Sequence, residues 1–194
     1  MIKDLTKKIT SSFLSCEKDA ELLLKKLFVE DRRHGDVLKK LLIINTKDCL
    51  SENLEKAQKY QEKINGYSVA RLIEEGYITF VPKLKILEHD EVKSYIVITF
   101  DNFSPTENPQ YRDCSISFDI VCHLDHWDIG NYQTRPLKIA GYIDGILNNA
   151  KLTGIGTLQF FHGQELILNS SLSGYSISYQ AVHGNDDKIP PLEV

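Results

Sequence analysis

The chain has 194 residues, of which 42% are hydrophobic and 26% charged, and its formal net charge is −4. This balance is typical of a globular protein, and the length suits one domain with room for an appendage. Residues 1–70 carry 14 Lys and Arg against 11 Asp and Glu, whereas residues 71–194 carry 9 against 16. The acidic main body argues against a nucleic-acid-binding protein, which needs clustered cations to displace counterions.

Composition also disfavours secreted and membrane proteins. The four cysteines are too few and too scattered for a disulfide framework, which favours a reduced, cytosolic protein. The first residues, Met1 to Lys8, carry charges every few positions and lack the apolar core of a signal peptide. No apolar run approaches the ~20 residues that span a bilayer. The sequence therefore predicts a soluble protein, made and kept inside a cell, with no membrane partner.

The first third of the chain has the apolar spacing of helices. From Ile2 to Phe28 apolar residues recur with helical period and no Gly or Pro interrupts them, which predicts one long helix that could face a partner. We expect a turn over 30–35, and then Asp36 capping a short apolar segment, 37–44, that suits either helix or strand. Helices over 51–65 and 68–75 complete a helical N-terminal region, residues 1–75.

The apolar period changes from 3.6 to 2 after Gly76, which predicts a sheet. Strands are expected over 77–87, 92–100 and 114–124, with exposed loops over 101–112 and 125–134. Thr134 and Pro136 are expected to start a helix over 135–150. Its apolar stripe must lie on the sheet, because such a face is not stable in water. The stripe consists of Ile139, Ala140, Ile143, Ile146, Leu147 and Ala150.

The remaining segments complete an α+β unit over 76–184. Residues 152–156 are expected to link the helix to a hairpin that turns at His162-Gly163-Gln164, and 174–182 to form the last strand. Residues 185–194 are an exposed tail. The predicted fold class is α+β, with a mostly antiparallel sheet, a helix packed on one face and a helical region in front of it.

No pattern predicts a catalytic, metal or cofactor site. The densest cluster of metal-ligand residue types is 122–128, but Cys114, the other nearby thiol, lies about 26 Å away along an extended strand. Glu91 and Lys93 match half of a nuclease signature, in which a carboxylate holds Mg²⁺, but the aspartate expected upstream is missing. Gly154-Ile-Gly156 follows a helix and precedes a strand, the reverse of a dinucleotide-binding loop. We therefore expect no enzyme and no cofactor.

Four residues near the start of the central helix suggest a contact surface. Trp127 and Tyr132 lie in one loop, and exposed aromatic residues mark interfaces; alternatively, the Trp127 ring folds back onto the sheet edge as a lid. Arg135 begins the helix, where the helix dipole disfavours a cation. We expect it to pair with a carboxylate, either Asp128 or one of a neighbouring subunit. Trp127, Asp128, Tyr132 and Arg135 are thus the hypothetical subunit interface.

The order of segments over residues 92–184 resembles that of the tail-terminator (tail-completion or neck) proteins of tailed bacteriophages. The segments are a strand, a Trp-containing loop, an Arg-Pro helix, a Gly-x-Gly link, a hairpin and a final strand. The residues that carry the resemblance are Phe118-Asp-Ile-Val-Cys-His123, Trp127, Arg135-Pro-Leu-Lys-Ile-Ala140, Thr153-Gly-Ile-Gly-Thr-Leu158, Gly174, Tyr175 and Tyr179.

The resemblance implies a structural virion protein without catalytic residues. Copies of it would form a ring, a hexamer or else a dodecamer, at the phage neck or the head-proximal end of the tail. Its other partners would be portal or adaptor and tail proteins, and DNA would pass through without specific binding. The protein would be made in the bacterial host cytoplasm and reside in the virion. The helical first 75 residues depart from the compact family pattern.

A ring that passes DNA should repel phosphate, because each cationic contact would retard transit. We therefore expect carboxylates to line the channel, and sheet edges with the two exposed loops to join the subunits. Two alternatives stay open: a Mg²⁺-dependent nuclease using Glu91 and Lys93, and an intracellular adaptor whose long helix binds a partner. The expected channel-lining residues are Asp101, Glu107, Asp113, Asp119 and Asp125.

Overall fold

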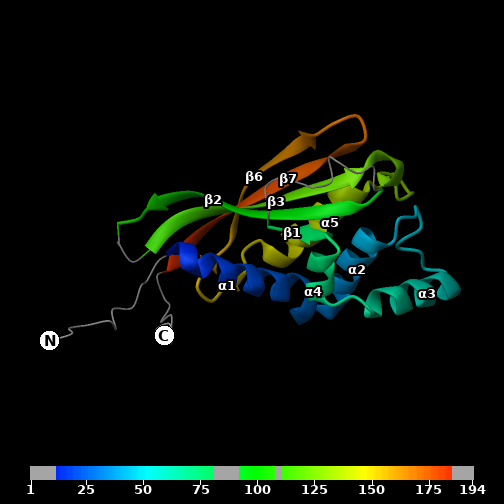
Figure 1. Cartoon of the computed structure of the whole chain (residues 1–194), viewed down its shortest axis with the longest axis horizontal. Coiled ribbons are helices and arrows are strands. Elements are labelled where there is room, and N and C mark those ends of the chain that lie inside the picture. Colours follow the sequence, from blue (N-terminus) through cyan, green and yellow to red (C-terminus); the bar gives the residue numbers. More distant parts are fainter. Residues whose placement is uncertain (1–11, 81–91, 108–110, 185–194) are drawn as a thin grey trace.

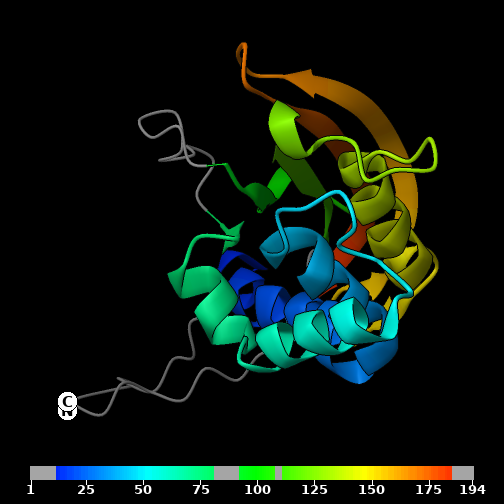
Figure 2. The ribbon, with the colours of Figure 1, turned by 90° about the vertical axis from the view of Figure 1, so that its right-hand side faces the viewer.

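The computed structural model of the protein describes residues 12–80, 92–107 and 111–184. It contains one five-stranded sheet, and both views show the helices gathered on one face of it (Figures 1 and 2). The α+β class, with a mostly antiparallel sheet and a helical region before it, is confirmed. None of the helices in the described part of the chain combines the length and apolar character that a bilayer crossing requires.

Helices dominate the chain before the sheet. The long helix predicted from Ile2 is present over its described part, and Ile2 to Ser11 lie outside the described residues. A five-residue π-helical turn, η1, ends it, and the ambiguous apolar segment is helical. The bounds are α1 (Ser12–Lys25), η1 (Lys26–Glu30), α2 (Arg32–Ile43), α3 (Leu54–Asn65) and α4 (Val69–Glu74).

The turn predicted over 30–35 and the cap predicted at Asp36 are wrong. The N-cap of α2 is Asp31, whose side chain accepts the backbone N–H of His34 at 3.2 Å. This contact satisfies one of the donors that a helix start leaves free. Gly35 allows the backbone of α2 to lie close to that of η1, because an added Cβ there would lie 2.8 Å from the Phe28 carbonyl oxygen.

The sheet has the strand order β1-β2-β3-β7-β6. The pair β1–β2 is parallel and the other pairs are antiparallel. A separate two-stranded ribbon, β4–β5, replaces the linker predicted over 152–156. The bounds are β1 (Ile78–Thr79), β2 (Ser94–Pro105), β3 (Tyr111–His123), η3 (Leu124–His126), α5 (Arg135–Leu147), β4 (Lys151–Leu152), β5 (Gly156–Thr157), β6 (Gln159–Ile167) and β7 (Leu172–Gly184).

Two predicted breaks in the sheet are strand instead. The loop expected over 101–112 is mostly β2 and β3, since β2 continues to Pro105 through a bulge at Asn102, which has φ 52°. Bulges of this kind bend a strand without ending it. The turn expected at His162-Gly163-Gln164 is also wrong, because β6 runs through it. The hairpin turns over 168–171, where the Asn169 side chain accepts the N–H groups of Ser171 and Leu172 at 2.8 Å each.

Helix α5 packs on the sheet through its apolar stripe, as predicted. Ile139, Ala140, Ile143 and Leu147 are buried against β3 and β7. Burial of each of the three larger side chains, Ile139, Ile143 and Leu147, stabilises the fold by roughly 1.5–3 kcal/mol. Tyr179 of β7 adds a polar tie, because its hydroxyl donates to Asp144 Oδ1 at 2.9 Å. The helix ends at Leu147, three residues earlier than expected, and the Thr134 hydroxyl that was expected to cap it is buried without a hydrogen bond.

Candidate functional site

The outer strand β6 is the most exposed regular element of the described sheet. All of its nine residues except Leu166 are exposed. Three of them are large and apolar: Phe160, Phe161 and Ile167 are 48%, 64% and 80% exposed. It pairs with β7 on one side only. Such a strand presents backbone N–H and C=O groups to another chain and is a ready template for strand pairing.

The face of the sheet away from the helices carries a polar groove of about 260 Å³. Side chains alternate along a strand, so Cys114, Ile116 and Phe118 enter the core while Ser115 and Ser117 face the groove. We call this the polar groove. It is lined by Thr99, Asp101, Asn102, Ser115, Ser117, Asp119, Phe161, His162, Gln164, Ser176 and Ser178.

Serine hydroxyls hold the two groove carboxylates. Ser117 donates to Asp101 Oδ2 at 3.5 Å and lies 2.9 Å from the hydroxyl of Ser178. Ser176 donates to Asp119 Oδ1 at 2.6 Å. Burial raises the pKa of Asp101, the Ser117 hydrogen bond opposes this, and the charge of Asp119 adds to the rise. The two carboxylates are therefore close enough to repel each other.

The structure brings together some of the five expected channel-lining residues. Asp101 and Asp119 share the polar groove, and Asp113 lies on the same face of β3 beyond it. Glu107 lies exposed after the end of β2. Asp125 is exposed in η3, where its Oδ2 lies 3.5 Å from His123 Nδ1. These last two are separate from the groove.

The groove is acidic because cations are scarce in the strands that form it. The strands β2, β3, β6 and β7 contain one arginine, Arg112, and no lysine. Arg112 is at an even-numbered position of β3, on the side of Cys114 and Ile116. The polar groove therefore has the electrostatic character of a surface that does not hold DNA.

The prediction that Arg135 pairs with a carboxylate is wrong. Its side chain is fully buried, and it has no carboxylate partner among the described residues. Its guanidinium donates to four backbone carbonyls at 2.5 to 3.0 Å. Three belong to the C-terminal end of α2 and the residues after it, where the helix dipole favours a cation. The acceptors are the carbonyl oxygens of Leu41, Ile44, Thr46 and His126.

Arg135 therefore joins three segments inside one subunit and is not available to a neighbouring copy. Two other members of the hypothetical interface have partners within the chain. Trp127 is half-buried against the core, with its ring centroid 6.4 Å from that of Tyr175, which favours the lid alternative. Asp128 accepts the Gly130 N–H at 2.8 Å and pairs with Lys47 at 3.1 Å, and both contacts lower its pKa.

Tyr132 is the member of that set with a freely exposed side chain. Its side chain is fully exposed to solvent. It forms the tip of a tight turn in which Gln133 N–H donates to the Gly130 carbonyl at 2.9 Å. Asn131 and Tyr132 have φ of 53° and 59°, so both central residues are left-handed, as in a type I′ turn. A tyrosine projects from the molecule at this point.

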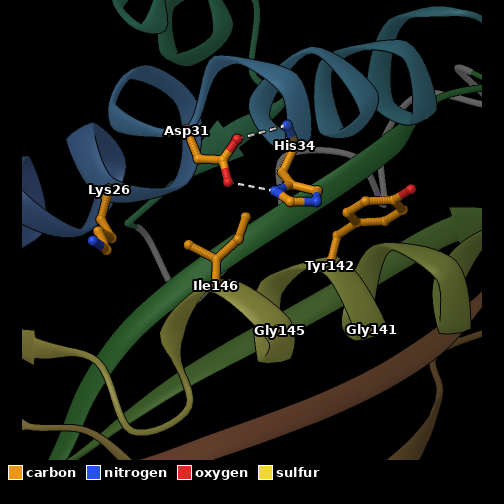
Figure 3. Close-up of a pocket in the computed structure, with 7 residues that line it drawn as sticks. All are labelled: Lys26, Asp31, His34, Gly141, Tyr142, Gly145 and Ile146. Carbon is orange, nitrogen blue, oxygen red and sulfur yellow. Dashed lines mark hydrogen bonds and ion pairs between the residues drawn. The ribbon is translucent and has the colours of Figure 1, made fainter.

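A second pocket, of about 370 Å³, lies between the α1–α2 junction and α5 (Figure 3). We call it the His34 pocket. No sequence pattern predicts this pocket, because 30–35 was expected to be a turn and Tyr142 carries no motif. It is lined by Lys26, Asp31, His34, Gly141, Tyr142, Gly145 and Ile146.

Neither the metal cluster nor the nuclease signature gains support from geometry. Among the described residues, no group of three His, Cys, Asp or Glu side chains is placed to hold a metal ion. Cys122 is buried, which raises the pKa of its thiol to about 11. Lys93 Nζ lies 5.7 Å from the centre of the Tyr77 ring. Glu91 lies outside the described residues.

A comparison with protein families finds a match to the family model described as YomW over residues 36–181. The match covers more than half of the chain and runs from α2 into β7. The name has the form of a gene name from a Bacillus phage region, which indicates a phage-associated protein. The comparison with curated proteins finds no match.

Proposed function

The chain belongs to the YomW family, whose name has the form of a phage gene name, and we propose that it is a structural protein of the virion. Copies of it join into a ring at the phage neck or the head-proximal end of the tail. The ring links the tail to the head connector and surrounds the DNA channel. No bond is made or broken in this role, and no cofactor or metal takes part in it.

The observation that carries this proposal is the exposed edge strand β6. Edge strands of monomeric proteins are usually short, charged or covered, since an open edge invites association. Strand β6 has nine residues and exposes Phe160, Phe161 and Ile167 to solvent. A neighbouring strand would cover these side chains and satisfy the outer backbone groups. A second copy of the chain supplies that strand in the proposed ring.

The opposite border of the sheet provides the surface that β6 meets. Within the described part of the chain, that border is formed by β1 and β2, and β1 pairs there with Ile96 and Val97 of β2. Two different borders that join each other make a heterologous contact, which repeats from copy to copy and closes when the rotation allows. A hexamer is the favoured closure, and a dodecamer is the second. Portal or adaptor and tail proteins would contact the two ends of the ring.

The polar groove lies on the channel side of the proposed ring. Helices cover the other face of the sheet, so the groove face is the one that can border a lumen (Figure 2). Asp101 and Asp119 would repel DNA phosphates, and the serine hydroxyls would bind water along the channel wall. DNA then passes without being held, because few counterions are released by a wall that lacks cations.

Sedimentation velocity of the purified chain tests the proposal. We expect a species of several copies whose fraction rises with protein concentration. The cause is burial of the apolar side chains of β6, at about 25 cal/mol per Å² of apolar surface. A monomer at every concentration up to several hundred micromolar, also in the presence of the phage's own neck and tail proteins, would contradict it.

A further inference from the structure

The His34 pocket has the shape and polarity of a receptor for one aromatic side chain. The rings of His34 and Tyr142 form its walls, with centroids 5.8 Å apart and planes inclined by 49° (Figure 3). Gly141 and Gly145 lie along α5 at its side, and a Cβ added to either would meet no atom within 4 Å. A flat group can therefore approach the backbone of α5. Lys26, which pairs with Glu30 at 3.0 Å, lies at the rim.

One polar atom on a side chain that lines the pocket, the Nε2 of His34, has no hydrogen bond to the described residues. The other ring nitrogen, Nδ1, lies 2.5 Å from Asp31 Oδ2, and this contact lowers the pKa of Asp31. An ionised carboxylate accepts from Nδ1–H, which leaves Nε2 to a partner. A tyrosine hydroxyl both donates and accepts, so it can bond to Nε2 whether or not His34 is charged. The pocket therefore suits a planar apolar group that ends in a hydroxyl.

Tyr132 has this chemistry, and its side chain is not covered by any of the described residues of its own subunit. Its ring is fully exposed, and a non-glycine residue in the left-handed region costs about 1–3 kcal/mol. The turn that imposes this conformation is held by the Gly130–Gln133 hydrogen bond and by Asp128. This strained backbone conformation does not stabilise a single copy, but it exposes the Tyr132 ring to another molecule.

We propose that Tyr132 of one copy inserts into the His34 pocket of the next copy. This inference rests on the proposed function, because it needs copies in contact. Tyr132 precedes α5 and Gly145 lies near its other end, so the inserted residue and its receptor are different surface sites. A contact between two different sites can repeat from copy to copy, as a ring requires, and it would add to the joining of sheet edges. Gly141 and Gly145 leave room for the tip of the incoming loop.

Cross-linking between two cysteine variants tests this contact. Gln133→Cys and Gly145→Cys, mixed under mild oxidation, should yield a covalent dimer, because Gln133 adjoins the inserted ring of Tyr132 and Gly145 lines the pocket. A disulfide requires Cα atoms roughly 4.4–6.8 Å apart. The double variant should give a ladder of species that ends at the number of copies in the ring. The matched control mixes Gln133→Cys with Leu54→Cys, since Leu54 is 86% exposed on α3 and is not among the residues that line the pocket.

Removing the ring gives an independent readout. Tyr132→Ala should weaken association at least tenfold, as for a residue at the centre of an interface, whereas Tyr132→Phe keeps the ring and should weaken it less. Cross-linking no stronger than in the Leu54→Cys control, with the wild-type chain assembling normally, would overturn the inference and leave the proposed function intact. A wild-type chain that never assembles would overturn both.

Discussion

Replacing Arg135 with methionine is expected to lower the free energy of unfolding by about 4 kcal/mol. Methionine has a similar length but no donor, so four backbone carbonyls lose their partner. The bonds to Leu41 and Ile44 are buried. A buried polar group left unsatisfied costs about 1–3 kcal/mol, and the bonds lost come from a charged donor. The C-terminal end of α2 and the 124–134 loop would both lose the Arg135 side-chain hydrogen bonds that join them to α5.

Denaturant unfolding followed by the fluorescence of Trp127 measures this loss. Trp127 is a suitable reporter because its carbonyl accepts the Arg135 backbone N–H at 2.7 Å. The matched control is Arg71→Met, which removes an arginine that bonds Glu75 and the Gly66 carbonyl at the surface. We expect that control to cost less than about 1 kcal/mol. Equal losses of unfolding free energy in the two variants would show that the four carbonyl bonds of Arg135 stabilise the fold no more than the surface bonds of Arg71.

Placing two lysines on β6 is expected to abolish assembly and leave the subunit folded. Phe161→Lys together with Ile167→Lys replaces exposed apolar side chains, 64% and 80% exposed, with charges. Lysine on an edge strand is a common barrier to edge-to-edge pairing, because the charge would have to leave water. Surface substitutions of this kind change the free energy of unfolding by about 0.5 kcal/mol or less. Sedimentation velocity should then show only monomer.

The control for the lysine variant places a single lysine at an exposed apolar position elsewhere. Leu54→Lys exchanges an 86% exposed leucine at the start of α3 and should assemble like the wild type. Assembly that survives both β6 lysines would exclude this edge as the joining surface. Loss of assembly in the α3 control as well would point to net charge instead of strand pairing.

Structural features that depend on the residues of a single helix or strand were predictable from the sequence. The stripe of Ile139, Ile143 and Leu147 identified α5 and the face that it buries, because helical spacing alone decides which side chains lie together. The change of apolar period after Gly76 likewise predicted the sheet and placed a strand over 114–124, within β3. Both features depend on residues a few positions apart.

Features that depend on distant partners were not predictable in this way. The sequence shows that Arg135 opposes its own helix dipole, but its acceptors lie about ninety residues earlier, at the end of α2. The His162-Gly163-Gln164 segment has turn composition, yet pairing with β7 keeps it extended and Asn169 forms the turn. The His34 pocket joins Asp31 to Tyr142, which periodicity cannot bring together.

Electron cryo-microscopy of the assembled wild-type protein shows directly how copies of the chain are arranged. We expect a closed ring in which β6 of each copy adjoins the β1–β2 border of the next, with Asp101 and Asp119 facing the central channel and α2 and α5 outside. A ring with the polar groove on its outer wall, or an assembly held together without β6, would contradict it.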